Sequence, residues 1–70
     1  MRTIYQILKL LYDWELPNMN RVEKRFVKDM WEASKGVGDN PTDESLIEQC
    51  GLSPARVKWI KDLGKEFLIK

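Results

Sequence analysis

Three breaks divide this sequence into four stretches, and each stretch has the spacing of apolar residues that is typical of a helix. The breaks are Pro17-Asn18, the segment of residues 36–41 with its glycines and proline, and Gly51. No stretch alternates apolar and polar residues for long enough to predict a strand. The pattern therefore predicts an all-α protein with helices over about residues 3–15, 20–35, 43–50 and 54–68.

The length of the chain allows for one hydrophobic core. Seventy residues are the size of a single small domain. A chain of this length buries only about 60% of the surface that it exposes when unfolded, so nearly every apolar side chain has to contribute to the same core. We therefore expect residues 1–70 to form one compact four-helix domain.

The residue types on which many enzymes depend are absent. The sequence has no histidine, which removes the commonest general base, the commonest metal ligand and any nucleophile that histidine activates. Its single cysteine, Cys50, cannot form a disulfide within the chain or a cysteine-based zinc site. The acidic residues Asp43, Glu44 and Glu48 are accounted for by a helix start, where the helix dipole favours carboxylates. We expect a binding protein without enzymatic activity, cofactor or metal.

The net charge of +1 hides three regions of different charge. Residues 1–36 hold seven basic and five acidic side chains, residues 37–53 hold four acidic and no basic ones, and residues 54–70 hold five basic and two acidic ones. The sequence pI of about 7.8 is below the value of about 9 that is typical of strongly basic nucleic-acid-binding domains. Any binding of phosphate must therefore depend on a local basic face of the protein and not on its overall charge.

The first predicted helix is apolar around more than half of its circumference. Its polar edge is narrow and consists of Gln6, Lys9 and Asp13. Either the helix lies in the centre of the domain, or a flank around Tyr5 and Tyr12 is a surface for a partner or for a homodimer. The polar edge argues against a signal peptide and a membrane span, and the unpaired Cys50 fits a cytoplasmic location.

The second predicted helix has an apolar side and a basic side. Asn20 and Glu23 have the spacing of a capping box at its start. The expected buried stripe consists of Val22, Phe26, Met30 and Ala33, flanked by Val27 and Trp31. The basic side carries Arg21, Lys24, Arg25, Lys28 and Lys35. This side is either a solvated face or a surface that contacts phosphate groups.

Residues 42–62, TDESLIEQCGLSPARVKWIKD, have the spacing of two short helices joined by a tight turn. Thr42 can cap the first helix, Gly51 can end it in the left-handed conformation, and Ser53 with Pro54 can start the second. The apolar positions around the turn are Leu46, Cys50, Leu52, Val57 and Ile60. This pattern resembles the helix-turn-helix motif of homeodomain-like DNA-binding proteins. It departs from that motif at Ile47, where a small residue is preferred because the two helices approach closely.

The resemblance implies a small DNA-binding or transcription-regulatory protein whose last helix enters the major groove. By position, the DNA contacts on this helix would be Ser53, Arg56, Lys58, Trp59, Lys61 and Lys65. The second helix would add Arg21, Lys24, Arg25 and Lys28 if its basic side lies on the same surface. Asp62 opposes this function, because a carboxylate beside the groove repels phosphate. The phrases VEKRFVKDM and LSPARVKWIKDL also have a loose similarity to small phage-encoded helical proteins, and accessory proteins of phages and plasmids are often this short.

A second hypothesis is a small helical protein-interaction module, or an inhibitor that docks on a host protein. Its candidate anchors are Tyr5, Tyr12, Trp14, Trp31 and Trp59. Trp59 lies outside the buried arc expected for its helix, so it could cover the edge of the core, anchor a protein partner or stack on a base. The position of Trp59 and of the basic residues in the folded chain distinguishes the two hypotheses.

Overall fold

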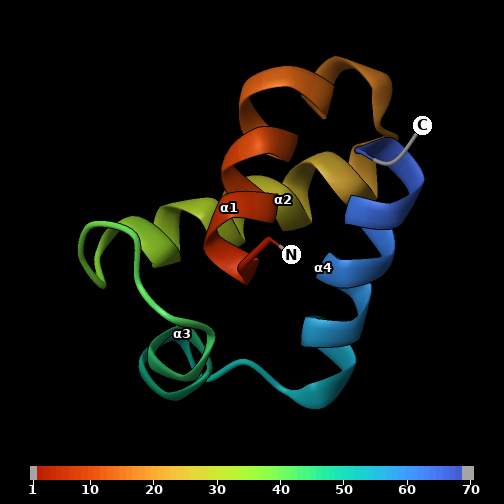
Figure 1. The fold of residues 1–70 in the computed structure, drawn as a ribbon. Helices are drawn as coiled ribbons and strands as arrows, with labels where there is room; N and C mark the ends of the chain where they lie inside the picture. Colours follow the sequence, from red (N-terminus) through yellow and green to blue (C-terminus); the bar gives the residue numbers. More distant parts are fainter. Residues whose placement is uncertain (1, 69–70) are drawn as a thin grey trace.

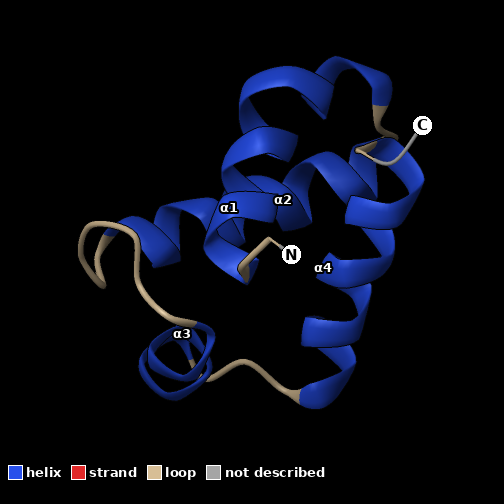
Figure 2. Cartoon of the chain, in the orientation of Figure 1, coloured by secondary structure: helices blue, strands red, loops and turns tan. Residues whose placement is uncertain are grey.

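The computed structural model describes residues 2–68, which form helices and connecting turns and contain no strand in that range (Figures 1 and 2). The elements in chain order are α1 (Ile4–Leu10), the π-helical segment η1 (Leu11–Glu15), the 3₁₀ turn η2 (Leu16–Asn18), α2 (Arg21–Lys35), α3 (Asp43–Cys50) and α4 (Pro54–Phe67). They pack into one globule with a Cα radius of gyration of 11.0 Å. The predicted all-α class with four helices is confirmed, and the bounds of the last three helices agree with the prediction to within a residue.

Each of the four helices begins at a polar residue that satisfies a backbone amide. The side-chain oxygen of each cap accepts a hydrogen bond from the amide three residues further on. The caps are Thr3, Asn20, Thr42 and Ser53. The predicted capping box is present, since Asn20 and Glu23 bond to each other's backbone amides at 2.8 and 3.1 Å. These local bonds determine where the helices start.

Helix α1 lies between the other three helices and contacts all of them (Figure 1). Its residues Ile4 and Leu8 are buried in the main core cluster, together with residues of α2, α3 and α4. Tyr5 and Tyr12 pack on the ring of Trp31, with centroid separations of 5.2 and 6.0 Å. The packing favours the central position predicted for this helix, because α2 covers much of the tyrosine flank that was the alternative partner surface.

One side of α4 is buried and packs against α1. Ile60, Leu63 and Gly64 are buried, and Val57 and Phe67 are half-buried. A Cβ atom on Gly64 would lie 3.1 Å from Cγ2 of Ile7, so the missing side chain lets α4 approach α1 closely. This close contact fixes the position of α4 relative to the central helix.

The helix predicted over residues 3–15 is helical from Ile4 to Glu15, but only Ile4–Leu10 is α-helical, and Leu11–Glu15 continues it as the π-helical η1. In an α-helix Trp14 would lie within about 20° of Ile7, on the flank that packs against Gly64. The wider turn of the π-helix rotates the residues that follow Leu10 around the axis. Trp14 is consequently 71% exposed.

The predicted buried stripe of α2 is wrong by about one residue, or about 100° around the helix. The buried residues are Val27, Trp31 and Ser34, whereas Phe26 and Met30 are half-buried. Val22 is 65% exposed and Ala33 is exposed. The physical reason is Trp31, whose large ring occupies the site under the two tyrosines. Ser34 can be buried with it because its hydroxyl donates a hydrogen bond to the Trp31 carbonyl at 2.8 Å.

A hydrogen bond between Asp43 and Ile4 joins the starts of α3 and α1. The amide of Ile4 donates to Oδ1 of Asp43 at 2.8 Å, in a partly buried position. Asp43 therefore has a structural role in addition to the helix-dipole role that the sequence indicated. The spacing along the chain gives no signal for this bond, because the two residues are 39 positions apart.

Replacing Asp43 by alanine is expected to lower the free energy of unfolding by about 1.5 kcal/mol, because the Ile4 amide loses a charged acceptor. Glu44→Ala is the matched control, since it removes a neighbouring carboxylate from the same first turn and Glu44 is exposed. Urea unfolding of both variants measures the difference. Equal losses for the two variants would mean that the helix dipole, rather than the bond to Ile4, accounts for the effect.

Candidate nucleic-acid interface

The corner between α3 and α4 has the turn that the sequence predicted. Gly51 adopts φ 64° and ψ 38°, which is the left-handed conformation, and its amide donates to the carbonyl of Ile47. Ser53 then accepts a hydrogen bond from the Arg56 amide at 3.3 Å, and Pro54 is the first residue of α4. Leu46, Leu52 and Ile60 are buried around this corner. Cys50 and Val57 are half-buried. The local chemistry of the turn is therefore as expected.

Replacing Gly51 by alanine is expected to lower the free energy of unfolding by about 1 kcal/mol, because the left-handed conformation is strained for residues with a Cβ atom. No atom lies within 4 Å of the position of that Cβ, so the backbone alone causes the loss. Gly36→Ala is the control, since Gly36 has φ −73° and an ordinary contact of 3.5 Å at its Cβ position. We expect it to be neutral or slightly stabilising in thermal unfolding. Equal effects of the two variants would contradict the proposed strain.

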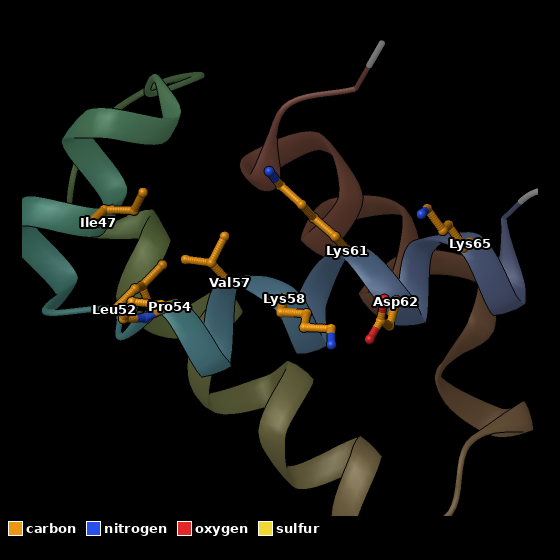
Figure 3. Close-up of a pocket in the computed structure, with 8 residues that line it drawn as sticks. All are labelled: Ile47, Leu52, Pro54, Val57, Lys58, Lys61, Asp62 and Lys65. Atoms are coloured by element: carbon orange, nitrogen blue, oxygen red, sulfur yellow. The ribbon is translucent and has the colours of Figure 1, made fainter.

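A groove lies between α3 and α4 on the outer side of the corner (Figure 3). Its volume is about 540 Å³, and its lining residues are Ile47, Leu52, Pro54, Val57, Lys58, Lys61, Asp62 and Lys65. Ile47 is 39% exposed at the α3 side of the groove. The sequence indicated the groove only indirectly. Ile47 stands where a small residue would let α3 and α4 approach closely, so a wider separation of the two helices was expected there. The apolar lining from Leu52, Pro54 and Val57 was not predicted, because the sequence indicated Leu52 and Val57 only as apolar positions around the turn and Pro54 only as a helix start.

The predicted contact residues on α4 all lie on its exposed side or at its start. They are Ser53, Arg56, Lys58, Trp59, Lys61 and Lys65. Lys58, Lys61 and Lys65 form a row along the helix, which we call the α4 stripe, and they border the groove (Figure 3). Asp62 follows Lys58 by one turn, so the two side chains are neighbours on the helix surface. The stripe therefore has three cationic side chains and one carboxylate beside them.

Trp59 covers the edge of the core, as one of its three interpretations predicted. Its ring stacks on that of Phe26 in α2, with a centroid separation of 4.0 Å and an interplanar angle of 21°. The side chain remains 36% exposed. The Phe26–Trp59 pair thus forms the seam between α2 and α4 and leaves only one part of Trp59 accessible to a partner.

The basic residues of α2 line a different hollow from those of α4. We call Arg21, Lys24, Arg25 and Lys28 the α2 stripe. On a helix with about 100° per residue, these side chains lie about 100–160° away from Phe26, and the α4 stripe lies about 100–160° away from Trp59. On its own helix, each stripe therefore lies away from the aromatic side chain that joins α2 to α4. The two hollows have no residue in common.

The remaining acidic and thiol groups form no metal site in the described part of the chain. Glu44 and Glu48 are exposed on α3, so the surface on that side of the groove is acidic. Burial raises the pKa of the Cys50 thiol, which keeps it protonated at neutral pH. Among residues 2–68, no three Cys, Asp or Glu side chains are grouped closely enough to hold a metal ion. None of the helices in that range has the length and apolar character that a bilayer span requires.

Comparisons of the chain with protein-family models, with curated proteins and with solved structures gave no match. Its function is therefore inferred from the geometry of the α3–α4 corner and the charge around it.

Proposed function

We propose that this protein is a small, non-enzymatic regulator that binds duplex DNA through the exposed side of α4. The observation that carries the proposal is the α3–Gly51–α4 corner, which combines a left-handed glycine turn with a capped second helix whose first two turns have an exposed side. In helix-turn-helix proteins the start of such a helix enters the major groove. The resemblance in sequence and the geometry of the turn support the same function.

The α4 stripe supports contacts to the DNA backbone. Lys58 and Lys65 are seven residues apart, which corresponds to about 10 Å along a helix. Long lysine side chains spread over this length can reach phosphates of the strand that borders the major groove, each of which carries one negative charge. The three lysines can therefore each neutralise one phosphate and release its counterions.

Residues at the start of α4 support contacts to the bases. Arg56 and Lys58 lie in the first two turns of the helix, from which side chains of helix-turn-helix proteins reach base edges. Both residue types bond to O6 and N7 of guanine. The Ser53 hydroxyl caps the helix at this end and can also contact a phosphate.

The proposed affinity is low for one molecule. A single module buries only about 600–1,000 Å² of its surface on DNA, and Asp62 together with the acidic face of α3 opposes binding. A second copy or a larger complex on neighbouring sites would raise the affinity.

The proposal includes the cytoplasmic location inferred from the unpaired Cys50.

The experiment that tests the proposal is a fluorescence-anisotropy titration of labelled, mixed-sequence duplex DNA at about 50 and 200 mM salt. We expect binding at micromolar protein that weakens as salt increases, because counterion release makes phosphate contacts salt-dependent. Undetectable binding at about 100 µM protein and low salt would contradict the proposal.

A protein-interaction module is the second candidate, and the groove is the observation that favours it. Ile47, Leu52, Pro54 and Val57 give this groove an apolar lining, and buried apolar surface is what protein partners commonly use. Affinity capture with the wild type and with Ile47→Ser separates the candidates. A partner protein that is lost with Ile47→Ser, in samples that contain no nucleic acid, would favour this function.

A further inference from the structure

The groove between α3 and α4 contains apolar surface that the proposed contacts to DNA do not use. Leu52 is buried and Val57 is half-buried, and these two residues form the apolar floor of the groove. Pro54 is exposed beside them, and Ile47 is 39% exposed on the α3 side. Phosphate groups gain nothing from these side chains, whereas an apolar side chain of a partner would bury them and release water.

Two lysines of the α4 stripe lie on the same side of α4 as the apolar floor. At about 100° per residue, Lys61 and Lys65 lie about 40° and 80° from Val57 around the helix. Lys58 and Asp62 lie farther around, at about 100° and 140°. Figure 3 shows the same division, with Lys61 and Lys65 extending to one side of α4 and Lys58 and Asp62 to the other. The charge beside the floor is therefore positive, and the one carboxylate of the lining lies farthest from it.

This arrangement selects a ligand with an apolar side chain and with carboxylates at a fixed spacing from it. Lys61 and Lys65 follow Val57 by four and eight residues, which is about 6 and 12 Å along the helix axis. A ligand that is itself a helix lying along α4 repeats its side chains at the same intervals. Its carboxylates would then meet the two ammonium groups, whereas a neutral or basic ligand would cover these groups without pairing them.

The shape of the groove also fits a helical segment of a protein. The groove is open to solvent between α3 and α4, so a small molecule would leave much of its surface in water. Its lining on α4 runs from Pro54 to Lys65, which is about 16 Å or three turns of a helix. A helix with an apolar face is a common occupant of such a groove, because its width of about 10 Å covers the floor and reaches both walls.

We infer that the groove binds an acidic amphipathic helix of a partner protein. The apolar face of this helix packs on Ile47, Leu52 and Val57, and its carboxylates pair with Lys61 and Lys65. Because both lysines are also proposed DNA contacts, the acidic helix and DNA exclude each other. Binding of the helix does not depend on the proposed function, but this regulation of DNA binding rests on it.

The test is an anisotropy titration with a fluorescent peptide of about 14 residues, or four helical turns. The peptide carries leucines spaced i, i+3, i+4 and i+7 on one face and glutamates on both flanks. We expect Ile47→Ser to bind it at least about tenfold more weakly than the wild type, because an apolar anchor of the groove is lost. A peptide with lysines in place of the glutamates is expected not to bind.

A pair of charge variants tests the assigned lysines. K61Q/K65Q is expected to bind the acidic peptide about fivefold more weakly than the wild type, because two ion pairs are lost. R21Q/R25Q is the matched control, since it removes two charges from residues that do not line the groove. Equal affinities of the two variants would mean that only the net charge of the protein attracts the peptide, and would overturn the inference.

A competition experiment connects the groove with the proposed function. Unlabelled acidic peptide is expected to displace a labelled duplex from the wild type and not from Ile47→Ser. The variant itself should bind DNA as the wild type does, because Ile47 is uncharged and is not among the proposed DNA contacts. Displacement of the duplex from both proteins alike would contradict the role of the groove.

Two further results would overturn the inference and leave the proposed function intact. One is a wild-type protein that binds duplex DNA but not the acidic peptide. The other is a dimer of the protein alone that Ile47→Ser dissociates in sedimentation velocity, which would mean that a second copy fills the groove. A protein that binds the peptide but no duplex would contradict the proposed function alone. Circular dichroism of the variants confirms that they are folded.

Discussion

The variant K58Q/K61Q/K65Q is expected to bind duplex DNA at least about tenfold more weakly than the wild type. Each lysine of the α4 stripe is exposed and borders the groove between α3 and α4. All three lie on the helix that we propose enters the major groove of the DNA. The slope of the logarithm of the binding constant against the logarithm of salt concentration should also become shallower by about 2.7, because each lost phosphate contact contributes about 0.9. Anisotropy titrations at several salt concentrations measure both quantities.

R21Q/R25Q/K28Q is the matched control for this experiment, because it removes the same number of charges from the other stripe. If affinity depended only on the net charge of the protein, the two variants would lose affinity equally. We expect a large loss for the α4 variant and a small one for the α2 variant, since α4 makes the major-groove contacts. Equal losses, or a larger loss for the α2 variant, would contradict the assignment of α4 as the DNA-binding helix.

Val27→Ala is expected to lower the free energy of unfolding by about 2 kcal/mol, while Val22→Ala should change it by less than about 0.5 kcal/mol. Val27 is fully buried in contact with the cluster formed by Leu11, Met19 and Leu63, whereas Val22 is 65% exposed on the same helix. The two substitutions remove the same atoms, so the difference reports burial alone.

The loss at Val27 is large for a protein of this size. At about 0.05–0.15 kcal/mol per residue, a chain of 70 residues has a total stability of roughly 4–10 kcal/mol. Chemical unfolding of the two variants therefore gives well-separated midpoints. A larger loss of unfolding free energy for Val22→Ala than for Val27→Ala would mean that Val22 belongs to the buried stripe of α2, as the sequence pattern predicted. It would contradict the orientation of α2 described above.

The parts of the fold that the sequence predicts well are those determined by local chemistry. The starts of α2, α3 and α4 follow from caps whose side chains bond to amides three residues away, and the end of α3 follows from Gly51. The turn of the candidate site was predictable for the same reason. Its exposed α4 residues were also predictable, because the buried side of that helix has a clear helical spacing.

The parts that sequence reasoning missed depend on contacts between distant segments. The orientation of α2 is determined by the fit of Trp31 under Tyr5 and Tyr12, which no spacing within α2 reveals. The bond between Asp43 and Ile4, and the fact that the two basic stripes line different hollows, likewise require the packed structure. The π-helical η1 gave no recognisable signal, since its residues continue the apolar pattern of α1.

The most direct test of the central claim is an NMR titration that follows the backbone amide chemical shifts as a short DNA duplex is added. If α4 is the DNA-binding helix, the largest changes will lie at residues 53–65, with smaller changes along the α2 stripe at higher DNA concentrations. The amides around the exposed Trp14 should not change. Changes absent from α4, or confined to residues elsewhere in the chain, would contradict the claim that this protein binds DNA through its α3–α4 corner.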